Sequence, residues 1–190
     1  PFATVSPAPG IERMSRSLAM ARSHPPTAKL ALLQELEQTL LGESEALPGT
    51  RRDLLRAVED TARELLDCDE AVFFPTGAGS QVQAYAPPAG EYSLLSPWIS
   101  ETVLAGDDLL LCPEVARVSG LFEEGARRNL GSLAAVALRS EAAGITGVLE
   151  LRAGEANFFS PARLARLSLA ADQFSAFLTR AARLEDLVFV

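Results

Sequence analysis

Hydrophobic positions follow a helical period in three long stretches of this chain. Apolar residues recur every three or four positions over residues 27–41, 50–66 and 160–186, which is the spacing of one face of an α-helix. A shorter helix is predicted over about residues 11–22, after a Pro-rich lead-in. The sequence therefore predicts helices at both ends of the chain.

The last of these stretches has a clear helix start and two apolar sides. Ser160 can cap the helix, and Pro161 suits its first position. One apolar stripe consists of Leu167, Ala171, Phe174, Leu178 and Ala181, and a second of Ala170, Phe177 and Leu184. A helix that is apolar on two sides needs two partners. We expect the second partner to be the helix over residues 27–41, within the chain or across a symmetric homodimer.

The middle of the chain has the pattern of short strands. Apolar or alternating runs occur at residues 71–74, 82–86, 108–111, 132–138 and 145–151. A helix is expected over residues 96–104, and one or two short helices within residues 112–129. The first two runs and the last two runs are each joined by a segment of hairpin length, which predicts antiparallel pairs. The last two runs are apolar on both faces, so we expect both to be central strands that are covered on each side.

This order of elements predicts an α+β fold. We expect a central antiparallel sheet of five or six strands flanked by helices, with an N-terminal lead-in and helical extension over residues 1–49. The main domain is expected over residues 50–187. Since the sequence does not begin with Met, we expect it to be part of a longer protein.

Charge and composition exclude several functions. The formal net charge is −8, and residues 68–160 contain 12 acidic and 5 basic side chains, which disfavours binding to nucleic acid or to an anionic membrane. No run is apolar enough for membrane insertion, and the two cysteines lack metal or redox-motif spacing, so we expect a cytoplasmic protein with reduced thiols. His24 is the only histidine, which argues against a His-based metal site or a Ser-His-Asp triad.

Two glycines stand in and beside the last predicted strand, "GITGVLEL". Gly144 suits the hairpin turn, where a positive φ is often needed. Gly147 lies inside the strand, where a missing side chain lets another group come close. That group is either a packed helix or a ligand, and the sequence leaves both open.

The ordered motifs "LLDCDEAVFF", "SLAAVALRS", "GITGVLEL" and "FFSPARLARLSLAADQF" resemble those of GAF domains, over about residues 53–184. Ala137 stands where the family often has proline, a small departure. The resemblance implies a sensory and dimerisation module with a ligand pocket between the sheet and residues 97–129. The ligand-binding residues that it implies are Tyr85, Trp98, Cys112, Arg117 and Phe122.

Few of the ligands that GAF domains bind fit the residues of this sequence. Cys112 is followed by proline and not by the histidine common at bilin attachment sites, and no histidine within the domain could bind haem. The Asn-Lys-Phe-Asp-Glu signature of cyclic-nucleotide binders is absent from the sequence. The branch that reduces free methionine sulfoxide uses several cysteines in the cap region, where only Cys112 stands. The cofactor therefore stays unknown, and bilin and haem are disfavoured.

The resemblance implies a non-catalytic sensory or regulatory domain of bacterial signal transduction. It would bind an unidentified small molecule, or pass a signal through its terminal helices as a homodimer to a signalling protein or fused output domain. Two alternatives remain: a degenerate GAF domain that acts as a dimerisation or interaction scaffold without a ligand, and a free methionine sulfoxide reductase.

Overall fold

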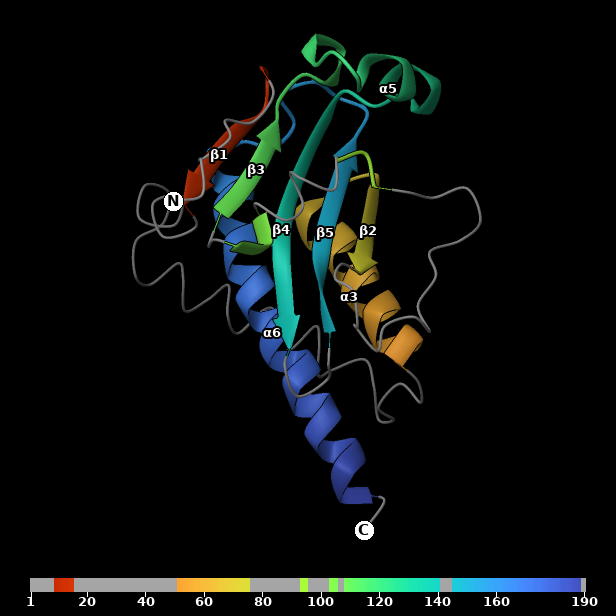
Figure 1. Ribbon diagram of the computed structural model, residues 1–190, viewed down its shortest axis with the longest axis vertical. Helices are drawn as coiled ribbons and strands as arrows, with labels where there is room; N and C mark the ends of the chain where they lie inside the picture. Colours follow the sequence, from red (N-terminus) through yellow and green to blue (C-terminus); the bar gives the residue numbers. More distant parts are fainter. Residues whose placement is uncertain are drawn as a thin grey trace.

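Five strands of the described chain form one sheet in the computed structural model, and two long helices lie against one side of it (Figure 1). The structure describes residues 9–15, 51–75, 93–95, 103–105, 108–140 and 145–188. The elements are β1 (Glu12–Ser15), α3 (Arg51–Leu66), β2 (Glu70–Pro75), β3 (Asp108–Cys112), the 3₁₀ turn η2 (Val115–Arg117), α5 (Phe122–Arg128), β4 (Ser132–Ser140), β5 (Ile145–Ala153) and α6 (Pro161–Val188).

The described strands have the order β1-β3-β4-β5-β2, and each neighbouring pair is antiparallel. The hairpin of β4 and β5 lies at the centre and pairs Ser132 with Ala153 and Ser140 with Ile145. The prediction that residues 132–138 and 145–151 are antiparallel neighbours is therefore confirmed. The α+β class, with a five-stranded antiparallel sheet flanked by helices, is also confirmed.

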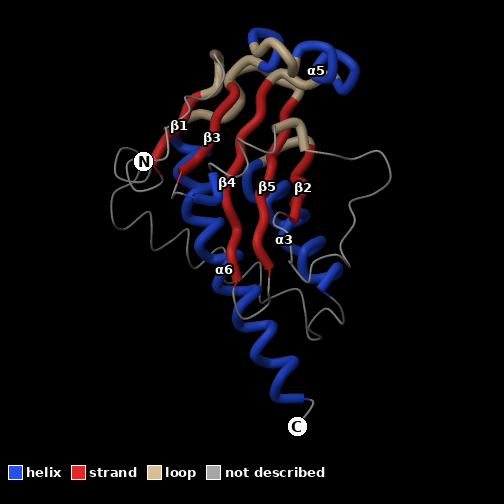
Figure 2. The backbone as a smooth tube through the Cα atoms, viewed as in Figure 1, coloured by secondary structure: helices blue, strands red, loops and turns tan. Residues whose placement is uncertain are grey.

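Side chains of the sheet alternate between two faces, and both faces are buried. We call the side that faces α3 and α6 the helix face, and Figure 2 shows both helices on this side of the sheet. Its core includes Phe73, Leu109, Leu111, Ala134, Val136, Leu138, Leu149 and Leu151. The opposite side, the second face, contains Leu110, Cys112, Leu133, Ala135, Ala137 and Val148. These residues pack with a group from outside the sheet: Leu94, Leu95, Val103, Val115, Val118 and Leu121.

Helix α6 begins where the sequence predicts. The Ser160 hydroxyl accepts a hydrogen bond from the Arg163 backbone N–H at 3.4 Å, as an N-cap should. As far as Leu178, both predicted apolar stripes belong to the core of the helix face: Leu167, Ala170, Ala171, Phe174, Phe177 and Leu178. Over this length the two apolar sides are covered within one chain, so their burial does not require a second copy.

Polar contacts also join α6 to the end of β4. The Arg139 backbone N–H donates to the Ser175 hydroxyl at 3.2 Å, and the hydroxyls of Ser140 and Thr179 are 3.0 Å apart. After this contact α6 continues past the end of the sheet (Figure 1). The helix is therefore tied to the central hairpin on one side and has a projecting C-terminal part.

Gly147 makes room for the neighbouring strand β2. A Cβ at this position would lie closer than 3.0 Å to the Phe73 ring and to the Phe74 carbonyl oxygen. The group closest to Gly147 is therefore strand β2, whereas the sequence leaves open a packed helix or a ligand. An aromatic ring from β2 fills the space that the glycine leaves on the helix face.

One sequence prediction is wrong within the described residues. The helix expected over residues 11–22 is replaced at Glu12–Ser15 by strand β1, which pairs with β3. Four residues make about one helical turn, which is too short for hydrophobic periodicity to decide between helix and strand. The open edge of β3 supplies backbone partners, and Met14 packs against the core of the helix face.

Several other predictions fall outside the described residues. These are the helix over residues 27–41, the strand over residues 82–86, the turn at Gly144 and most of the helix over residues 96–104. Residues 103–105 are helical.

Candidate functional site

Two charged side chains are completely buried in the middle of the sheet. Glu150 and Arg152 on β5 are both 0% exposed, and no other charged residue in the described part of the chain is buried. They are two residues apart, so both side chains lie on the second face with Val148. Their neighbours across the strand pairs are Ala135 and Leu133 on β4 and Val72 and Glu70 on β2.

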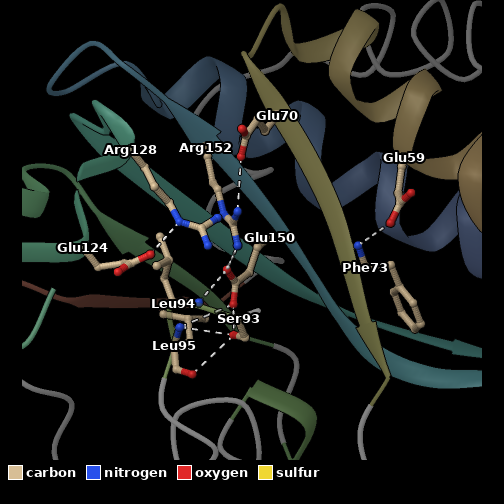
Figure 3. Close-up of polar contacts among 10 residues, drawn as sticks. All are labelled: Glu59, Glu70, Phe73, Ser93, Leu94, Leu95, Glu124, Arg128, Glu150 and Arg152. Carbon is tan, nitrogen blue, oxygen red and sulfur yellow. Dashed lines mark hydrogen bonds and ion pairs between the residues drawn. The ribbon is translucent and has the colours of Figure 1, made fainter. Parts of the chain in front are cut away.

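Glu150 holds a short segment that covers the second face. Its carboxylate accepts hydrogen bonds from the Ser93 hydroxyl and from the backbone N–H groups of Leu94 at 3.2 Å and Leu95 at 3.4 Å (Figure 3). The Leu95 N–H also donates to the Ser93 hydroxyl oxygen at 3.1 Å, which closes a local turn. One buried carboxylate therefore satisfies donors of three consecutive residues.

Arg152 connects this carboxylate to β2. One guanidinium nitrogen lies 3.3 Å from Glu150, and another lies 3.2 Å from Glu70, whose side chain is half exposed. The guanidinium carbon is 5.6 Å from the centre of the Phe74 ring. Removing one member of such a buried pair leaves an uncompensated charge, whereas replacing both by apolar residues is often tolerated. The pair is thus costly to break but unnecessary for simple core packing.

Of the predicted ligand residues that the structure describes, only Cys112 lies on the second face. Cys112 is buried there. Arg117 is 76% exposed and pairs with Glu114 at 2.6 Å, and Phe122 is 56% exposed at the start of α5. Tyr85 and Trp98 lie outside the described residues. The described part of the predicted set therefore does not converge on one point.

Sequence reasoning missed Glu150 and Arg152, although a signal was present. The run over residues 145–151 is predicted to be apolar on both faces and covered on each side, yet it contains a glutamate, with an arginine two positions later. Charges on alternate positions of a strand covered on both sides must be paired inside the protein. The conflict between a covered strand and two charged side chains identifies Glu150 and Arg152 as a candidate site.

The two cysteines lie on opposite faces of the sheet. Cys68 belongs to the core of the helix face and Cys112 to that of the second face, and both are free thiols. Burial raises the pKa of Cys68 to about 12. Burial also raises the pKa of Cys112 to about 11, opposed by a backbone hydrogen bond at Glu114. Both groups are thiols and weak nucleophiles at neutral pH.

In the described part of the chain, no three or more His, Cys, Asp or Glu residues are arranged to hold a metal ion. No helix among these residues has the length and hydrophobicity of a membrane span.

Comparison with models of known protein families gives no match for this chain. Comparison with curated protein sequences gives none either.

Proposed function

We propose that this chain is a non-catalytic regulatory module of the GAF type, which senses a small molecule on the second face and passes the signal through α6. One observation carries the proposal. The second face contains a buried pair, Glu150 and Arg152, and Glu150 of this pair holds the covering segment at residues 93–95. A polar group inside an otherwise apolar, covered region is a feature of small-molecule sites.

The position of α6 supports its role as output. It packs on the opposite side of the same central hairpin and is tied to β4 through Ser175 and Thr179. A shift of the hairpin on ligand binding would therefore reach the projecting end of α6. A ligand can drive this shift only if it binds the two helix arrangements with different affinity.

The absence of catalysis is part of the proposal. Cys112 and Cys68 are separated by the sheet, and both have pKa values raised well above neutrality. A thiol relay for sulfoxide reduction needs a reactive thiolate and a second thiol within reach. Within the described residues, neither cysteine meets both needs.

A scaffold without a small ligand is the second candidate, and a specific observation favours it. Side chains of the protein itself cover the described part of the second face, because Leu133, Ala135 and Val148 are each fully buried. In this case the chain would act through dimerisation or through a protein partner at the end of α6, and the buried pair would only hold the fold.

Native mass spectrometry of freshly purified protein separates the two candidates. The sensor predicts extra mass under gentle conditions that is lost on denaturation. Ala135→Val would enlarge a second-face side chain, and Ala134→Val is the matched control on the helix face of the same strand. We expect Ala135→Val to lower the occupied fraction and Ala134→Val to keep it. Protein that never has extra mass, in cell extract or after purification, would support the scaffold instead.

A further inference from the structure

The segment at residues 93–95, called the strap below, is held in two different ways. Leu94 and Leu95 are buried in the core of the second face. The strap's own polar groups, the Ser93 hydroxyl and two backbone N–H groups, all donate to Glu150 (Figure 3). The leucines supply apolar burial. Glu150 supplies an acceptor for the Leu94 N–H, and it shares the Leu95 N–H with the Ser93 hydroxyl oxygen.

We propose that Glu150 is a latch that decides whether the strap covers the second face. With the carboxylate in place, lifting the strap breaks three hydrogen bonds at once. Arg152 holds the carboxylate from the other side at 3.3 Å, and Glu70 holds Arg152 at 3.2 Å, so the latch is anchored to both β5 and β2. A ligand that enters this face beneath the strap would have to open the latch, and this last step rests on the proposed sensory function.

The chain contains its own reporters for the two faces. Cys112 lies in the core of the second face together with Leu94 and Leu95, and Cys68 lies in the core of the helix face. Each thiol can react only when its own face opens. When reclosing is fast, the rate of alkylation reports the opening equilibrium of that face. The ratio of the two rates distinguishes a lifted strap from general unfolding.

The test is alkylation of the unliganded chain with N-ethylmaleimide, followed by peptide mass spectrometry, in three variants. Glu150→Gln removes the charge of the latch. Ser93→Ala removes one donor and leaves the buried pair with Arg152 intact. Glu59→Gln is the matched control, because Glu59 also accepts a strand N–H, that of Phe73 at 2.7 Å, but does so from α3.

We expect Glu150→Gln to speed alkylation of Cys112 about tenfold or more, and Ser93→Ala to speed it about threefold to tenfold, because charge-assisted hydrogen bonds are lost. Cys68 should change far less in both variants, and Glu59→Gln should leave Cys112 unchanged. Equal acceleration of both cysteines, or an unchanged Cys112 rate in Ser93→Ala, would overturn the latch. If Glu150→Gln fails to fold, Ser93→Ala decides alone. No ligand is used, so a failed search for bound small molecules does not affect the outcome.

Discussion

Replacing Gly147 with alanine tests how β2 and β5 fit together. The new Cβ would lie closer than 3.0 Å to two atoms of the Phe73 ring and to the Phe74 carbonyl oxygen. The ring is the end of a side chain, but Phe73 is fully buried, so it has little room to turn. The carbonyl is backbone in the pairing of β2 with β5 and cannot move without disturbing that ladder.

The expected cost follows from two opposing effects. Overpacking in a well-packed core costs about 1–3 kcal/mol, and the fixed backbone oxygen places this site toward the upper end. Alanine in place of glycine returns about 0.5–1 kcal/mol, because the unfolded chain loses freedom. The net free energy of unfolding should fall by about 1–2.5 kcal/mol. For a chain of this size that corresponds to a Tm lower by about 3–8 °C.

Urea denaturation followed by circular dichroism measures the effect, with Thr146→Ala as the control at the neighbouring, partly exposed position. A double-mutant cycle with Phe73→Leu isolates the ring. If the ring is the obstacle, the two substitutions should be non-additive by at least about 0.5 kcal/mol, with Gly147→Ala costing less once the ring is gone. A Gly147→Ala protein as stable as the wild type would refute the reasoning, and strict additivity would leave the Phe74 carbonyl as the only obstacle.

Four further predictions follow. Ser160→Ala should lower the free energy of unfolding by about 0.5–2 kcal/mol through loss of the α6 cap, and a urea midpoint equal to the wild type would contradict it. The raised pKa of Cys112 means that the folded state holds the thiol proton more tightly than the unfolded state, whose pKa is near 9.0. Stability should therefore fall as the pH rises from about 9 through about 11, and urea midpoints of Cys112→Ala should fall less steeply over that range. The protein should not turn over free methionine sulfoxide with a thiol reductant, and steady turnover that is lost in Cys112→Ser would show otherwise. The full chain should form a homodimer in sedimentation equilibrium at micromolar concentration, and truncation after Thr179 should give a folded monomer; a full chain that stays a 20.2 kDa monomer on concentration would exclude the dimer.

The central hairpin and the last helix could be predicted because local and global signals agree there. Residues 132–138 and 145–151 are long, apolar and joined by a short loop, and Ser160 and Pro161 define the start of α6. Strand β1 could not be predicted in this way. Its four residues become a strand because β3 offers an edge, and that edge is formed by residues almost a hundred positions later.

The candidate site was harder to predict because the role of its residues depends on whether they are buried in the fold. Arg117 and Phe122 have the chemistry of ligand contacts, but both are exposed at the end of the molecule near α5. Glu150 and Arg152 stand in and just after a run that is predicted to be covered on both faces, but the sequence does not show which residues pair with them. Their partners come from β2 and from residues 93–95, which only the fold brings to β5.

The second face could have been closed without any charge. Val72 and Ala135, the neighbours of Glu150 across the two strand pairs, are apolar and buried, so an apolar side chain at position 150 would continue the surroundings. Such a residue would bury Leu94 and Leu95 equally well, but it could not accept their N–H groups. A carboxylate accepts from the strap when the strap is down and from water when it is lifted, so both positions leave its oxygens satisfied. In the proposed sensor, the free-energy difference between the two positions of the strap would therefore depend on Glu150 as well as on the leucines, and a ligand would shift this balance only by binding the two positions with different affinity.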